Sequence, residues 1–145
     1  MIFGGLHKTS VIDYSGKVSC ALFLSGCNFV DCPYRHNPEL VKGHLSHLPV
    51  LDEKAFFGHL DECIGFLDGV VISGGEPTLH EALPFICERI KRMGYPVKLD
   101  ANGSLPKAIE QLIREDLVDY VAMDIKTAHL LYSPHMHHTF HLRLG

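Results

Sequence analysis

The chain has 145 residues, which is enough for one domain of ordinary size and too few for two. Hydrophobic residues make up 46% of it and charged residues 21%, so the composition excludes disordered and fibrous proteins. The 13 Lys and Arg against 17 Asp and Glu give a net charge of −4, and the basic residues form no stripe that would favour nucleic acid.

No apolar run approaches the roughly 20 residues that a membrane-spanning helix needs, and the N-terminal segment lacks the pattern of a secretory signal. We therefore expect a cytoplasmic protein that binds neither a membrane nor nucleic acid. The odd number of cysteines, 5, favours free thiols or metal ligands over a disulfide framework in such a compartment.

Four short apolar runs, each flanked by turn residues, predict β-strands at residues 18–25, 69–73, 97–101 and 120–125. Three stretches of helical period lie between them, at about residues 56–67, 83–93 and 105–117. This alternation predicts an α/β fold with right-handed crossovers and a parallel sheet covered by helices.

Two local patterns predict where helices begin. Thr78 and Glu81 have the spacing of a capping box directly after Pro77, which favours a helix start at this point. Ser104 is predicted to be the N-cap of the third helix, with Pro106 in its first turn.

From about residue 127 the sequence becomes rich in histidine, contains no acidic residue and loses its period. We therefore expect a βα domain over residues 1–126 and a His-rich tail over residues 127–145 that does not continue the repeat. A sheet of four strands would then end on an exposed parallel edge, which favours aggregation.

The carboxyl ends of the first two predicted strands carry candidate functional groups, as parallel sheets of this kind usually do. Cys27 and Cys32 follow the first strand on a loop, either as ligands of an iron–sulfur cluster or zinc or as two ordinary thiols. Gly74 and Gly75 permit close approach of the backbone to a ligand. Glu76 either places a carboxylate at the rim of a site or favours the start of the following helix.

The third and fourth predicted strands also end in polar residues. Asp100 and Asn102 end the third strand, where Asn followed by Gly is also a common turn. Asp124 and Lys126 end the fourth, where they could equally form a surface ion pair of little energetic value. Four successive strands thus deliver polar or thiol groups to one edge of the predicted sheet.

Taken together, these segments resemble the radical S-adenosylmethionine (radical SAM) enzymes. Among them the chain is most similar to activating enzymes of glycyl-radical proteins, of the anaerobic ribonucleoside-triphosphate reductase activating protein type. The similarity extends over residues 8–17, 22–29, 32–34, 36–39, 68–79, 98–106 and 118–126.

This resemblance implies a partial parallel (β/α) barrel of radical SAM type, truncated here to about four strands. It also implies a [4Fe–4S] cluster on three cysteines, with one iron free to bind S-adenosylmethionine. Such an enzyme would cleave S-adenosylmethionine reductively and generate a glycyl radical on a partner such as anaerobic ribonucleotide reductase. Flavodoxin or ferredoxin would be the electron donor.

Site residues follow from the resemblance position by position. Cys27 and Cys32 match the first two cluster cysteines, and Tyr34 matches an aromatic residue near the adenine. The segment that holds the methionine amino group in relatives corresponds to Gly74, Gly75 and Glu76. Strand-end positions that contact the cofactor or order its site correspond to Asp100, Asn102, Asp124 and Lys126.

The cysteine loop departs from the family pattern. Relatives carry C-x₃-C-x₂-C, whereas here one residue is inserted after Cys27 and Arg35 replaces the third cysteine. A guanidinium has no lone pair to offer and cannot ligate iron. His36 is the best local substitute, because imidazole replaces thiolate in Rieske centres. The three remaining cysteines are predicted to pack in the core: Cys20, Cys63 and Cys87.

Relatives usually continue with further βα units, whereas this chain leaves their pattern after Lys126. One hypothesis for this departure and for the altered cysteine loop is a pair of local reading-frame shifts. Resequencing that reproduces the same frame at both places would refute it.

Three functions remain open from the sequence. The first is a radical SAM activating-enzyme homologue with weak or no activity, and the second is a non-catalytic relative that binds S-adenosylmethionine or the partner without a cluster. The third is a zinc-binding module in which mixed thiolate and imidazole ligands suit tetrahedral zinc. Its ligands would be Cys27, Cys32, His36 and either His137 or His138.

Overall fold

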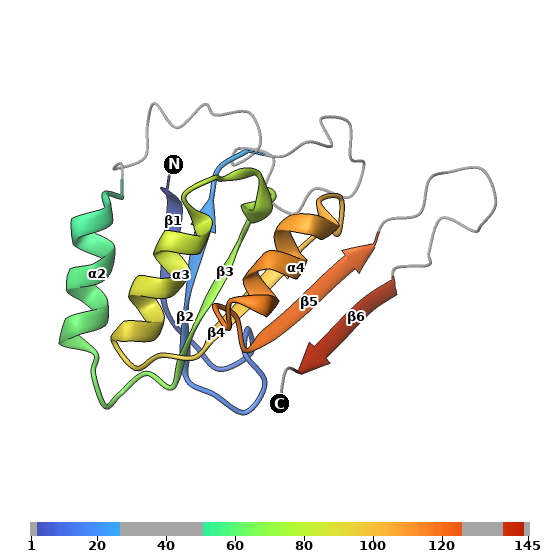
Figure 1. Ribbon diagram of the computed structural model, residues 1–145. Coiled ribbons are helices and arrows are strands. Elements are labelled where there is room, and N and C mark those ends of the chain that lie inside the picture. The colour runs from blue at the N-terminus through green and yellow to red at the C-terminus, as the bar shows by residue number, and fades with distance from the viewer. Residues whose placement is uncertain (1–2, 27–50, 126–137, 144–145) are drawn as a thin grey trace.

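The computed structural model of the chain describes residues 3–26, 51–125 and 138–143 (Figure 1). They form one six-stranded sheet in which neighbouring strands follow the order of the sequence. Its strands are β1 (Phe3–Ser10), β2 (Ser19–Leu24), β3 (Gly69–Gly74), β4 (Val97–Ala101), β5 (Tyr120–Ile125) and β6 (His138–Arg143).

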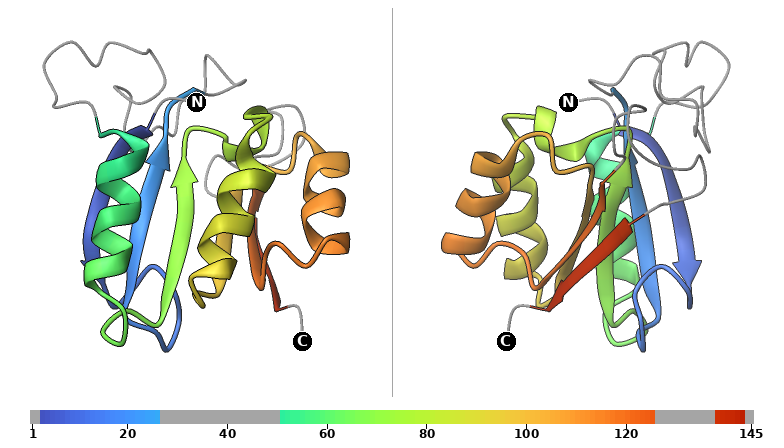
Figure 2. Two further views of the ribbon diagram at one scale, coloured as in Figure 1. Left: turned by 60° about the vertical axis from the view of Figure 1, so that its left-hand side comes forward. Right: turned by 90° about the vertical axis from the view of Figure 1, so that its right-hand side faces the viewer.

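The four central strands, β2 to β5, are parallel, as the sequence predicts. Three helices connect them and lie on one face of the sheet (Figure 2): α2 (Glu53–Glu62), α3 (Leu83–Arg92) and α4 (Pro106–Arg114). The α/β class is therefore confirmed. None of the helices in these described ranges is long and apolar enough to cross a membrane.

Both edges of the sheet are antiparallel strands that sequence reasoning missed. β1 pairs with β2, and β6 pairs with β5 from Ile125 opposite His138 to Tyr120 opposite Arg143. The expectation of an exposed parallel edge at β5 is therefore wrong, because the backbone of residues 138–143 bonds to that edge. The division of the chain at residue 126 into a domain and a tail stays a prediction.

Two predicted helix caps are wrong. A 3₁₀ helix, η1 (Pro77–Leu79), follows β3, and α3 begins only at Leu83 with no side-chain cap. The capping box at Thr78 does not form, because the Thr78 amide donates to the Glu76 carboxylate instead. The N-cap of α4 is Leu105 and not Ser104, although Pro106 does lie in the first turn as predicted. The Ser104 amide donates to the Asn102 side chain at 2.9 Å.

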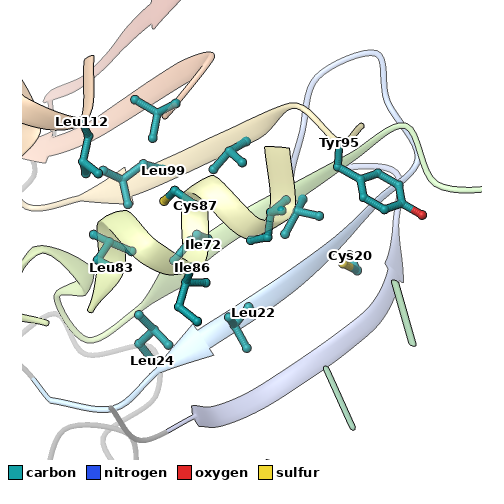
Figure 3. Packing of buried hydrophobic residues seen from close by; sticks show 14 of the residues in the cluster. Cys20, Leu22, Leu24, Ile72, Leu83, Ile86, Cys87, Tyr95, Leu99 and Leu112 are labelled. Carbon is teal, nitrogen blue, oxygen red and sulfur yellow. The ribbon is translucent and has the colours of Figure 1, made fainter. Parts of the chain in front are cut away.

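The main core fills the space between the sheet and the helices (Figure 3). Alternate residues of β2 point into it, and these include Cys20, Leu22 and Leu24. Burial raises the pKa of the Cys20 and Cys87 thiols to about 12, which keeps both protonated. The prediction that these two cysteines belong to the core is therefore confirmed, and Cys63 packs against it partly buried.

A smaller cluster lies on the opposite, helix-free face. Tyr14, from the β1–β2 connection, packs on Ala21 and Val71, with the ring of Tyr120 6.0 Å from its own. A Cβ at Gly69 would lie 3.0 Å from the Tyr14 ring, so the connection sits close to the sheet. This face is thus covered near the amino end of β3.

Replacement of Gly74 by alanine should abolish or strongly reduce folding. Gly74 has a φ of +121°, and a Cβ there would lie 2.2 Å from the Leu24 carbonyl oxygen. Relief would require β2 and β3 to move apart, at a cost of about 3 kcal/mol or more. Chemical denaturation followed by circular dichroism measures this loss.

The matched control is Gly58→Ala in α2. Gly58 has an ordinary φ and open space around its Cβ position, so alanine should stabilise the protein by about 0.5–1 kcal/mol. Equal effects of the two substitutions would contradict the close approach of β2 and β3 at Gly74.

Candidate functional site

The carboxyl ends of the parallel strands carry polar side chains on the helix-free face. Val70, Ile72 and Leu99 face the helices, so the residues that alternate with them face the other way. Ser73 lies in register with Phe23 of β2 on one side, and Asp100 with Ala122 on the other. By this alternation the helix-free face carries Ser25, Ser73, Asp100 and Asp124.

The loop after β3 is joined directly to the end of β2. The Gly75 amide donates to the Leu24 carbonyl at 2.9 Å, and the Glu76 amide donates to the Gly26 carbonyl at 2.7 Å. Only glycine at position 74 lets the two backbones come so close. This contact sets the loop beside the point where the chain enters the cysteine segment.

The Glu76 carboxylate is fully buried and joins the ends of β3 and β4. Its Oε1 accepts hydrogen bonds from the Thr78 amide, at 3.0 Å, and from the Thr78 hydroxyl. Its Oε2 accepts one from the Asn102 amide at 2.6 Å. The predicted position at the rim is therefore wrong, because Glu76 has no exposed surface. The alternative, a residue that starts the next helical turn, is confirmed, since Glu76 caps η1.

Asp100 lies on the helix-free face beside a lysine. The Lys98 ammonium is 2.9 Å from Asp100 Oδ1 and also donates to the Asp13 carbonyl at 2.6 Å. Burial raises the pKa of Asp100, and the Lys98 charge and a hydrogen bond from Ser73 offset only part of this rise. The Asp13 charge adds to it. A carboxylate with this environment at a strand end is typical of a functional site.

The described part of the predicted site is brought together at one edge of the sheet. Gly74, Gly75 and Glu76 end β3, Asp100 and Asn102 end β4, and Asp124 is half-buried near the end of β5. The turn interpretation of Asn102 is also correct, because its side chain binds the Ser104 amide. Outside the described residues lie Cys27, Cys32, Tyr34, Arg35, His36, Lys126 and His137.

Sequence reasoning missed two residues of this edge, Ser25 and His80. The Ser25 hydroxyl oxygen is buried and has no hydrogen-bond partner within the described ranges. Its carbonyl lies 2.9 Å from Nε2 of His80, 55 positions later in the chain. Alternation along the first strand could have pointed to Ser25, whereas nothing local in the sequence signals the contact of His80.

Among residues 3–26 and 51–125, no group of three histidine, cysteine or acidic side chains could hold a metal ion. The zinc-binding hypothesis is not tested by this finding, because Cys27, Cys32 and His36 all lie outside them.

Comparison with known proteins gives the context of this edge. A sequence model of the Radical SAM superfamily matches residues 22–144. The chain is 44% identical over 126 residues to a protein of Methanocaldococcus jannaschii named "Putative glycyl-radical enzyme activating enzyme", a match that covers 86% of this chain and 50% of that one. A Haemophilus influenzae protein of the same name is 31% identical over 106 residues, which cover 70% of this chain and 40% of that protein.

A 7-carboxy-7-deazaguanine synthase of Aquifex aeolicus is 36% identical over 95 residues, or 62% of this chain and 38% of that enzyme. The chain thus spans about half the length, or less, of these curated relatives. The family match over residues 22–144 includes β3, β4 and β5, whose ends carry the polar residues.

Glu76→Gln should destabilise the fold although it keeps the shape of the side chain. Both carboxylate oxygens accept hydrogen bonds from backbone amides, so the new NH₂ group must face a donor. We expect a loss of about 1–3 kcal/mol in urea denaturation. Glu81→Gln, at an exposed position, should change stability by less than about 0.5 kcal/mol. Equal effects would show that the Glu76 contacts contribute nothing.

Asp100→Asn should change how stability depends on pH. Because the pKa of Asp100 is higher in the folded chain than its ordinary value of 3.8, the folded protein binds this proton more tightly. Wild-type stability relative to Asp100→Asn should therefore fall as the pH rises from 3.8 through the raised pKa. Denaturation of both proteins at a series of pH values measures the difference.

Lys98→Met should steepen this fall, because the ammonium lowers the pKa of Asp100. A stability difference between wild type and Asp100→Asn that is flat or rises with pH would contradict the direction of the shift.

Proposed function

The chain belongs to the radical SAM superfamily, and from this premise we propose that it is a relative of the glycyl-radical enzyme activating enzymes that binds S-adenosylmethionine at the carboxyl ends of β3, β4 and β5. The observation that carries the proposal is the pair of hydrogen-bonded contacts made by the buried Glu76 carboxylate. This carboxylate bonds to Thr78 and Asn102 and so keeps the Gly-Gly segment beside the polar end of β4.

The hydrogen-bonding groups at this edge suit the polar parts of S-adenosylmethionine. Gly75 has no side chain to keep an amino group from its backbone, while Gly74 holds the loop against β2 and Glu76 supports it from the buried side. The buried Ser25 hydroxyl, without a partner in the described ranges, provides a further hydrogen-bonding group nearby. Further contacts are proposed for Asp100, Asn102, Asp124 and Lys126, with Tyr34 near the adenine.

The iron ligands are the second part of the proposal. Members of this superfamily generally use a [4Fe–4S] cluster, which supplies the electron that cleaves S-adenosylmethionine when it is bound. The cysteine loop of this chain does not fit the three-thiolate pattern, because Arg35 cannot ligate iron. Cys27 and Cys32 would hold two irons, and a third ligand would have to be the imidazole of His36.

The partner follows from the names of the relatives. A glycyl-radical enzyme would be the substrate, and a glycine of that enzyme would lose a hydrogen atom. An electron donor such as flavodoxin or ferredoxin would be needed as well. Since this chain spans about half of those relatives, both partners are part of the proposal.

A second function is favoured by one specific observation, the contrast between the two loops. The Gly-Gly-Glu loop keeps its contacts to β2 and β4, whereas the cysteine loop has lost a thiolate. A chain of this kind could bind S-adenosylmethionine or the partner protein without a cluster. Iron content separates this non-catalytic relative from the activating enzyme.

Iron and acid-labile sulfide should be measured on anaerobically purified, reconstituted protein. If His36 completes the ligand set, about four of each per chain are expected. Cys27→Ala should lose them, while Cys87→Ala, which removes a buried core thiol, should not. The cluster-bearing protein with dithionite should then release 5′-deoxyadenosine from S-adenosylmethionine. Background iron in all three proteins would refute the activating enzyme and favour the non-catalytic function.

A restored loop tests the role of Arg35 separately. Deletion of Val30 together with Arg35→Cys recreates the C-x₃-C-x₂-C spacing in this chain. We expect this variant to bind about four irons whatever the wild type does. Failure of the restored loop to bind iron would show that the defect lies outside these positions.

A further inference from the structure

Three consecutive carbonyl groups at the end of β2 accept hydrogen bonds from a single loop. Leu24 and Gly26 accept from the backbone amides of Gly75 and Glu76, at 2.9 and 2.7 Å. Between them, the Ser25 carbonyl pairs with Nε2 of His80 at 2.9 Å. Because a carbonyl can only accept, His80 must carry its proton on Nε2. Of the three donors, His80 is the one side chain.

His80 is itself held firmly in the backbone. It ends η1, where its amide donates to the Pro77 carbonyl at 3.1 Å. Its own carbonyl accepts from the Leu83 amide at 2.9 Å, at the start of α3. The backbone of His80 is therefore fixed on both sides, and the hydrogen bond from its ring holds the Ser25 carbonyl in place.

The backbone that receives this contact, Ser25 and Gly26, ends the described part of the chain before Cys27. Gly26 has a φ of +104°, and glycine can adopt a wider range of dihedral angles than any other residue. Sterics at Gly26 therefore do not determine where the chain goes after β2. The hydrogen bonds to the Ser25 and Gly26 carbonyls do, one residue before Cys27.

We propose that His80 is a positioning residue that fixes the backbone direction at Ser25 and Gly26, where the chain leaves β2 directly before Cys27. The geometric part stands on the contacts of His80 alone. Its consequence for iron binding rests on the proposed function.

Amide hydrogen exchange on the iron-free protein tests the geometric part. The Glu76 amide reports on the chain exit, because it donates to the Gly26 carbonyl. H80L removes the donor and should speed exchange at Glu76 by about tenfold or more. H80Q keeps an N–H donor at similar reach and should restore slow exchange. The fully buried Ile72 should exchange at the wild-type rate in both variants, and His7→Leu should leave all rates unchanged.

If H80L fails to fold, H80M provides a second side chain without a donor and the same comparison with H80Q. Unchanged exchange at Glu76 in the folded donor-free variant would overturn the proposal. Exchange at Glu76 that is as fast in H80Q as in the donor-free variant would also overturn it, because loss of the imidazole ring, and not loss of the N–H donor, would then explain the faster exchange.

Iron content distinguishes this proposal from the proposed function. Less iron in H80L than in H80Q and wild type would support both. Faster exchange with no iron in any of the proteins would support the positioning role and refute the cluster. Equal iron with unchanged exchange would refute the positioning role and leave the cluster standing.

Discussion

The site depends on one buried carboxylate. Glu76 has no exposed surface, yet its two oxygens join the loop after β3 to the turn after β4. A buried ionised group is tolerated only where hydrogen bonds replace the lost water, and here backbone amides and a hydroxyl do so. The same loop approaches β2 so closely that only glycine fits at position 74. The ends of β2, β3 and β4 are thereby held together, and this fixes the positions of the polar groups that they carry.

Most of the central fold could be predicted because it rests on local patterns. The apolar runs of β2 to β5 are buried and parallel, and their predicted bounds differ from the observed ones by about one residue. The two edge strands, β1 and β6, were not predicted, for different reasons. β1 contains a Gly-Gly pair and exposed polar residues, and β6 lies in a segment dominated by histidine. Each forms by pairing with a neighbour, which a local pattern does not reveal.

The sequence predicted which residues lie at the candidate site better than it predicted what each of them does. Motif order alone gathered Gly74, Glu76 and Asp100, and the sheet does bring them to one edge. The role of Glu76 at the start of the next helical turn was one of the two predicted, but its hydrogen bond to the end of β4 was not, because Asn102 lies 26 residues away. The capping box at Thr78 failed for a local reason, because Glu76, two residues earlier, accepts from the amide that such a box would use. Alternation along β2 could have pointed to Ser25, but its contact with His80, 55 residues later, could be found only in the structure.

The central claim is that this edge binds S-adenosylmethionine whether or not the cysteine loop holds iron. Isothermal titration calorimetry of S-adenosylmethionine into iron-free protein tests it most directly, with Gly75→Val as the variant and Gly58→Ala as the control. We expect heat of binding in the wild type and the control, and none in folded Gly75→Val, whose side chain would cover the backbone. Absence of binding to the wild type, or equal affinity in Gly75→Val, would contradict the account.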